Sequence, residues 1–168
     1  MLRMRYVGVL VVALALVLMG GGVAAWDYDR DGWDDLFFAQ GGREAFQAAP
    51  TAAGQTPSTG EIPAAADRQN LHSTAQLYRN QRGAGWSRVS EVAGLNLAGY
   101  GHGVATADFD EDGFCDLLLC RYGSLALMHN QGDGTFADVT IQAGLESRNW
   151  STSAAWADLD RDGDLDLY

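Results

Sequence analysis

The stretches Asp108-Phe-Asp-Glu-Asp-Gly-Phe-Cys-Asp-Leu and Asp158-Leu-Asp-Arg-Asp-Gly-Asp-Leu-Asp-Leu share one pattern, Asp-x-Asp-x-Asp-Gly-x-x-Asp-Leu. An earlier partial copy runs from Asp27 to Leu36. An offset of 50 residues aligns residues 77–117 with 127–167 without a gap, and 15 of the 41 aligned positions are identical. A period of this length is typical of repeat architectures such as solenoids and propellers.

The residues around each acidic stretch predict strands. Short apolar runs bounded by glycine and aspartate precede it at 103–109 and 153–159, and others follow it at 36–38 and 117–120. A further hairpin is expected from 125–130 and 135–141, on either side of a Gln-Gly-Asp-Gly turn. Four strands per repeat predict an all-β fold, a partial β-propeller of four-stranded antiparallel blades with about two and a half blades present. The small alanines at 105, 107, 155 and 157 suit strands that crowd near a central axis.

Each acidic stretch also has the composition of a metal-binding loop. Three carboxylates on alternate residues would all turn inward in a loop that curls about a cation, and the glycine at the sixth position permits the sharp turn. The next residue would offer its backbone carbonyl, and the ninth-position aspartate would close the cage. An all-oxygen, highly charged cage favours Ca²⁺ over Mg²⁺, so about three calcium sites are expected. The predicted ligands are Asp27, Asp29, Asp31, Trp33 and Asp35 in loop 27–36, Asp108, Asp110, Asp112, Phe114 and Asp116 in loop 108–117, and Asp158, Asp160, Asp162, Asp164 and Asp166 in loop 158–167.

Two observations bear on these loops. A helix-loop-helix calcium hand needs a bidentate glutamate at position 12, where this chain has Phe38 and Leu119, so that motif is excluded. The net charge is −11, and residues 27–35, 108–116 and 158–166 hold 15 of the 22 acidic residues. Charge this dense needs a counter-cation, although acidic turns without metal remain the alternative. The acidity also argues against nucleic acid as a partner.

The N-terminal residues predict export. Two arginines precede an apolar run over residues 6–19, and small residues follow it. Residues 1–25 are therefore expected to be a secretion signal, which places the protein outside the cell, in the periplasm or at the cell surface. The alternatives are an uncleaved membrane anchor through residues 6–19, or an opening strand of the first repeat at residues 20–24. Residues 26–168 then form the repeat segment, with a flexible insertion at 40–75 that contains all three prolines.

These residues resemble the FG-GAP/VCBS repeats of the integrin-α-like propeller superfamily. More narrowly, Leu127-Met-His-Asn-Gln-Gly-Asp-Gly-Thr-Phe-Ala-Asp-Val-Thr with Ala143-Gly-Leu is similar to proteins related to cartilage acidic protein, which often carry an ASPIC/UnbV segment. The resemblance covers residues 20–168, with 40–75 unmatched. It implies a seven-bladed ring of which this chain is a part, calcium in the blade loops, extracellular placement and a role in adhesion or partner binding.

No sequence motif for catalysis is present. Nucleophile-elbow, zincin, phosphate-loop and dinucleotide patterns are all missing. We therefore predict a non-enzymatic calcium-binding scaffold whose partner is a protein or glycan of the cell surface or matrix. The alternatives are the framing part of a propeller enzyme, glycan-degrading or redox, with its active site in other blades, or a structural spacer in a larger surface protein.

The tryptophans and cysteines carry weaker predictions. Trp86, Trp150 and Trp156 align with other residues in the neighbouring repeat, which favours core or inter-blade packing over a sugar-stacking platform. Cys115 and Cys120 are separated by an odd number of positions, so along a strand their side chains point to opposite faces. A disulfide between them is not expected.

Overall fold

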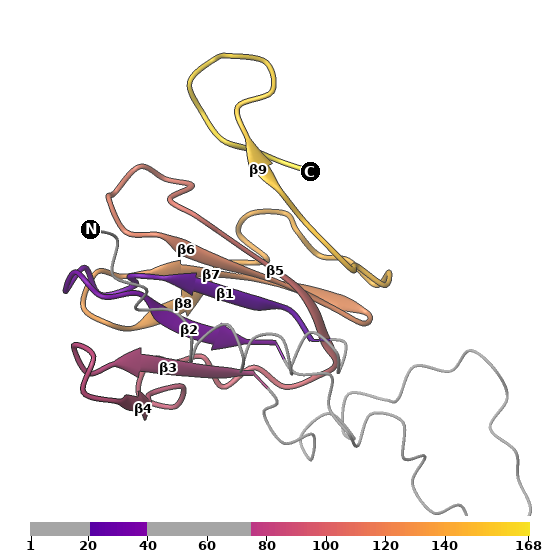
Figure 1. The fold of residues 1–168 in the computed structure, drawn as a ribbon. Coiled ribbons are helices and arrows are strands. Elements are labelled where there is room, and N and C mark those ends of the chain that lie inside the picture. The colour runs from indigo at the N-terminus through magenta and orange to yellow at the C-terminus, as the bar shows by residue number, and fades with distance from the viewer. Residues whose placement is uncertain (1–20, 40–74) are drawn as a thin grey trace, which may run out of the picture.

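The computed structural model describes residues 21–39 and 75–168, and within them all regular structure is β-strand. The first sheet contains β1 (Val23–Trp26), β2 (Asp35–Phe38), β3 (Gln76–Asn80) and β4 (Trp86–Arg88). The second contains β5 (Gly101–Ala107), β6 (Asp116–Arg121), β7 (Ser124–Asn130) and β8 (Phe136–Asp138). β9 (Trp156–Ala157) and β10 (Asp166–Leu167) form a separate two-stranded hairpin, which we call the third hairpin because it belongs to the third repeat. In each sheet, neighbouring strands are antiparallel and follow chain order (Figure 1). We call the two complete sheets blade 1 and blade 2.

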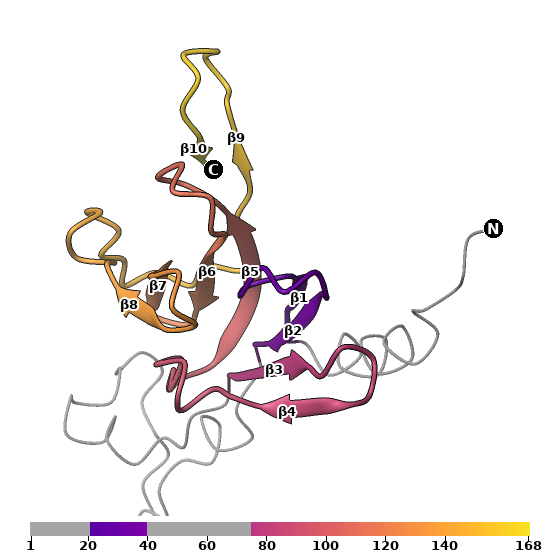
Figure 2. The same ribbon diagram turned by 90° about the vertical axis from the view of Figure 1, so that its left-hand side faces the viewer.

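The first strands of successive repeats lie side by side. β1 contacts β5, and β5 contacts β9, as Figure 2 shows from the side. Two glycines permit this approach: a Cβ on Gly22 would lie 2.4 Å from the carbonyl oxygen of His102, and one on Gly103 would lie 2.5 Å from that of Thr152. Innermost strands that meet in this way are what blades arranged around an axis require.

The core lies between the two blades. β2 contributes three consecutive apolar side chains and β6 contributes four, and both strands are buried on both faces. From these strands Phe37, Leu117 and Leu119 enter the shared cluster, where they pack with Leu77 of β3 and Met128 of β7. This burial explains the continuous apolar runs of the sequence, because a strand covered on both faces has no polar side to alternate with.

Several strand boundaries differ from the predicted ones. β8 ends at Asp138 rather than at residue 141, because the chain turns: the Ala143 N–H donates to the Val139 carbonyl at 2.9 Å and the Leu145 N–H to that of Thr140 at 3.0 Å. β9 is also shorter than predicted, covering two residues of 153–159. In blade 1 the β3–β4 hairpin forms without a Gly-Asp-Gly turn, because Arg82 and Gly83 adopt φ of 52° and 81°.

The predicted N-terminal segment and insertion fall largely outside the described residues. Ala75, the last residue of the predicted insertion, is buried in the core. β1 begins at Val23, so cleavage after Ala25 would remove most of that strand. Within residues 21–39 and 75–168 we find no helix with the length and apolar character needed to cross a membrane.

Candidate metal centre

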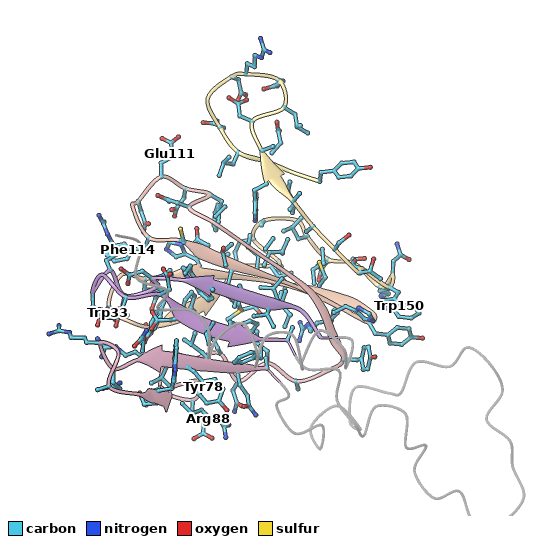
Figure 3. The ribbon with its side chains drawn as sticks, viewed as in Figure 1. Trp33, Tyr78, Arg88, Glu111, Phe114 and Trp150 are labelled. Atoms are coloured by element: carbon cyan, nitrogen blue, oxygen red, sulfur yellow. The ribbon has the colours of Figure 1, made fainter. Side chains whose placement is uncertain are left out.

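The three acidic loops turn at the same two positions. In each, the fourth residue and the glycine at the sixth position have positive φ, a region that a Cβ atom disfavours and that glycine, which has none, tolerates. The values are 56° and 88° for Arg30 and Gly32, 59° and 93° for Glu111 and Gly113, and 66° and 104° for Arg161 and Gly163. The turn predicted at each glycine is confirmed. Glu111 points away from the sheets, so the fourth side chain stays outside the curl of the loop (Figure 3).

The first aspartate of each loop fixes this curl by accepting backbone hydrogen bonds. The Asp27 carboxylate accepts from the N–H groups of Asp31 and Gly32 at 3.0 and 2.7 Å. Asp108 accepts from the equivalent Asp112 and Gly113 at 3.0 and 2.9 Å. In the third loop, the Asp158 carboxylate accepts from Arg161 at 2.6 Å.

The loops bring carboxylate oxygens together. In each of three groups, one oxygen per residue lies within 4.8 Å of the others: Asp27, Asp29 and Asp31; Asp108, Asp110 and Asp112; Asp158, Asp160 and Asp166. In the first loop, the Asp29 Oδ1 atom is buried and has no hydrogen-bond partner. Hard oxygen donors at this spacing suit a hard cation, so these acidic clusters could hold a metal ion.

The ninth-position aspartate lies at the base of each loop, where it joins strands. Asp35 is fully buried and accepts from the Tyr28 N–H at 3.2 Å and from the Asn80 N–H at 2.7 Å. Asp116 is equally buried and accepts from Phe109 at 3.1 Å and Asn130 at 2.8 Å. We call each arrangement a carboxylate clamp, because one side chain ties the start of the loop and the third strand to the second strand. In the third loop, Asp166 accepts the equivalent bond at the start of the loop, from the Leu159 N–H at 2.9 Å.

The clamp divides the predicted ligands into two groups. Asp35 is not in the first oxygen cluster, and Asp116 joins a separate group with Asp110 and His129. In the third loop, the oxygen cluster contains Asp166 and not Asp162. The Asp162 Oδ1 atom instead accepts a hydrogen bond from the Asp164 N–H at 3.0 Å. The predicted carbonyl donors Trp33, Phe114 and Asp164 each follow the loop glycine directly, and in each the N–H donates to the fifth-position aspartate.

Burial changes the acidity of this region. It raises the pKa of the Asp35 carboxyl to about 7, against the opposing effect of the hydrogen bonds from Asn80 and Tyr28. Burial likewise raises the pKa of Asp116 and of Asp29. The Tyr28 hydroxyl, buried near Asp29 and Asp35, has its pKa raised to about 12.

These pKa values predict a pH dependence for the protein without metal. A carboxyl whose folded pKa lies above its unfolded value binds more protons in the folded state, so stability falls as pH rises between the two values. For Asp35 that interval runs from 3.8 to about 7. We expect the free energy of unfolding in EDTA to fall by about 2 kcal/mol from pH 5 to pH 7, measured by urea denaturation. The Asp35→Asn variant should show a shallower fall, and an identical slope in both proteins would contradict this origin.

Two side chains that we did not select as site residues reach into the acidic loops. Arg79 on β3 places Nε 2.6 Å from Asp29 Oδ2 and an Nη atom 3.4 Å from Asp31 Oδ2. At the equivalent position on β7, His129 places Nδ1 3.1 Å from Asp116 Oδ1 and 3.3 Å from Asp110 Oδ2. The 50-residue alignment pairs these positions, and each precedes an identical asparagine, Asn80 or Asn130. The sequence signal for this position is therefore its place directly before an asparagine that both repeats share.

Blades 1 and 2 also meet at their loops. The Arg30 guanidinium lies over the Phe114 ring, 5.2 Å from its centroid, and Asn130 Nδ2 donates to the Tyr28 carbonyl at 2.9 Å. Trp33 and Phe114 mark this common end of the blades, opposite Trp150 (Figure 3).

The structure tests the predictions for the tryptophans and cysteines. Trp156 stacks on Phe109 of the preceding repeat at 6.2 Å, so its inter-blade packing is confirmed. Trp150 is exposed, yet it makes edge contacts with His102 and Tyr122 of blade 2. The prediction for Trp86 is wrong, because its side chain on β4 is 42 % exposed, whereas the aligned Phe136 on β8 is buried. Cys115 and Cys120 are both free thiols, so they form no disulfide with each other, as predicted.

Comparison with known families bears on the second and third loops. Residues 108–168 match the FG-GAP-like repeat. The FG-GAP-like segment begins at the first aspartate of the second loop and includes β6, β7, β8 and the third hairpin. Together with the four-stranded antiparallel sheets, it confirms the predicted fold class, an all-β partial propeller, and indicates a propeller-type scaffold. No curated protein matches the sequence.

Proposed function

We propose that this chain is a calcium-binding propeller scaffold, exported from the cytoplasm, that serves adhesion or partner binding and has no catalytic activity of its own. One observation carries the proposal: three loops with positive φ at the same two positions each gather three carboxylate oxygens within 4.8 Å. Repetition of this turn and of a carboxylate cluster at three places argues for a shared ligand rather than for three unrelated acidic turns.

The donor chemistry favours calcium. Ca²⁺ takes six to eight oxygen ligands in a flexible shell, whereas Mg²⁺ demands a tight octahedron and retains its water. The residues that would hold it are the clustered aspartates of each loop, with the carbonyls of Trp33, Phe114 and Asp164 as further donors. When bound, the ion would neutralise carboxylates that otherwise repel one another, so its role is structural and metal binding is coupled to folding.

The proposed setting and partner rest on other features. The basic and apolar N-terminal residues support export to the cell surface, the periplasm or the medium. Away from the loops, Tyr122 and Trp150 expose 55 % and 57 % of their surface beside each other. Exposed aromatic rings are frequent contact residues for proteins and glycans, which supports a partner of that kind.

Calorimetric titration with CaCl₂ tests the metal sites directly. The 168-residue chain would be stripped with EDTA, titrated, and followed in parallel by circular dichroism. We expect saturable binding together with a gain in β signal and in melting temperature. At a free calcium concentration 100 times the dissociation constant, each site should add about 2.7 kcal/mol to the free energy of unfolding. Unchanged stability at millimolar calcium would count against the proposal.

Substitutions in single loops provide a sharper test. Asp110→Ala and Asp160→Ala each remove one clustered carboxylate, and each should lose most of one site's share of the calcium-dependent stabilisation. Glu111→Gln is the matched control, because it removes a carboxylate of the same loop that points away from the sheets. A melting temperature in calcium that neither alanine variant changes would refute the structural role.

A further inference from the structure

The residue before the clamp asparagine differs between the blades, and with it the charge that faces each loop. In blade 1 this residue is Arg79, whose guanidinium contacts Asp29 and Asp31, two of the three clustered carboxylates. In blade 2 it is His129, which contacts Asp110 and the clamp residue Asp116. Of these two, only Asp110 belongs to the carboxylate cluster of the second loop. Both side chains leave the third strand of their blade toward the β1–β2 or β5–β6 loop.

The contacts of Arg79 are those of a counter-ion. The guanidinium is permanently charged, and its carboxylate partners are shielded from water: the Asp29 and Asp31 side chains are 13 % and 11 % exposed. By comparison, Asp110 is 37 % exposed. Arg82 also faces Asp31, at 3.7 Å, but it is 73 % exposed and so contributes little.

We propose that Arg79 is a built-in cation of the first loop, which stabilises blade 1 without metal and makes this loop the weakest calcium site of the three. The inference rests on the proposed calcium-binding function and adds a rank order to it. A fixed positive charge in contact with two ligands of a divalent cation both occupies their oxygens and repels the ion. The Asp29 Oδ1 atom has no hydrogen-bond partner, so the first loop retains a donor and binds weakly rather than not at all. Coulomb repulsion at this range predicts at least a tenfold loss of affinity.

The test compares Arg79→Gln with Arg88→Gln in the 168-residue chain. Arg88 lies on β4 of the same blade and faces Glu91, so its variant makes the same change in net charge away from the loop. Calorimetry after EDTA treatment should show one more tight calcium equivalent for Arg79→Gln than for the unchanged chain, and none more for Arg88→Gln. In EDTA, Arg79→Gln should melt at a lower temperature than Arg88→Gln, and calcium should restore it.

Equal numbers of equivalents and equal affinities in Arg79→Gln and the unchanged chain would overturn the proposal. If the unchanged chain binds no calcium, the proposed function fails, and a gain of one equivalent in Arg79→Gln still supports the counter-ion role. If Arg79→Gln does not fold, the reciprocal variant decides. His129→Arg should weaken one site at least tenfold, and unaltered binding in that variant would overturn the proposal.

Discussion

Replacement of Asp116 by alanine is expected to lower the free energy of unfolding by about 3 kcal/mol. The side chain is 1 % exposed and accepts from the backbone N–H groups of Phe109 and Asn130, at 3.1 and 2.8 Å. Alanine offers neither group an acceptor, and a buried donor without a partner costs about 1–3 kcal/mol. The cost is partly offset, because the variant no longer buries a carboxyl whose pKa is raised by desolvation.

Urea denaturation at neutral pH would measure this effect. Asp116→Asn retains one oxygen and should lose less stability than the alanine variant. Glu111→Gln, an exposed change in the same loop, should be within about 0.5 kcal/mol of the unchanged protein. A loss for Asp116→Ala no greater than that of Glu111→Gln would show that the clamp does not hold the blade together.

The variant Gly103→Ala is expected to have a comparable cost, about 3 kcal/mol, for a different reason. The added Cβ would lie 2.5 Å from the Thr152 carbonyl oxygen and 2.9 Å from the Ser153 Cα atom. Both neighbours are backbone atoms, so no side-chain rotation can relieve the clash, and the innermost strand of blade 2 must move away from the segment that leads into β9.

Gly101→Ala on the same strand is the comparison. Its nearest neighbour would be the Ala39 Cβ at 3.1 Å, a contact that a small shift can relieve, and we expect a cost of about 1 kcal/mol. Urea denaturation of both variants would rank them. Equal losses would indicate that the close approach of successive inner strands is not what Gly103 provides.

The sequence was most informative where the chain repeats itself. Three copies of one acidic pattern predicted three loops with glycine at the turn, and the φ of Gly32, Gly113 and Gly163 confirms them. The apolar run at 117–120 predicted a strand buried on both faces, because such a run has no polar face to give to solvent. The odd spacing of Cys115 and Cys120 also predicted correctly that no disulfide joins them.

What the sequence did not predict depends on contacts between distant positions. Arg79 contacts Asp31, which lies 48 positions away in the sequence. No local sequence pattern shows which carboxylate the side chain of a strand arginine will contact. The ninth-position aspartate was predicted as a ligand, and spacing alone could not show that its oxygens accept hydrogen bonds from two other segments of its blade. The repeat alignment, which pairs Trp86 with Phe136, predicted packing for both: Phe136 is buried against Tyr28 of blade 1, whereas Trp86 is 42 % exposed.

The carboxylate clamp has a consequence for the order in which the blades form. Asp116 and Asn130 are 14 positions apart, with only Tyr122 and Gly123 between β6 and β7, whereas Asp35 and Asn80 are 45 positions apart. Closing the longer loop costs more chain entropy before any contact offsets it, and contacts of low sequence separation form faster. Blade 2 should therefore fold first and give blade 1 a surface on which to assemble. Pulse-labelling hydrogen exchange should protect the Asn130 amide before the Asn80 amide, which would make the second repeat the folding nucleus of the chain.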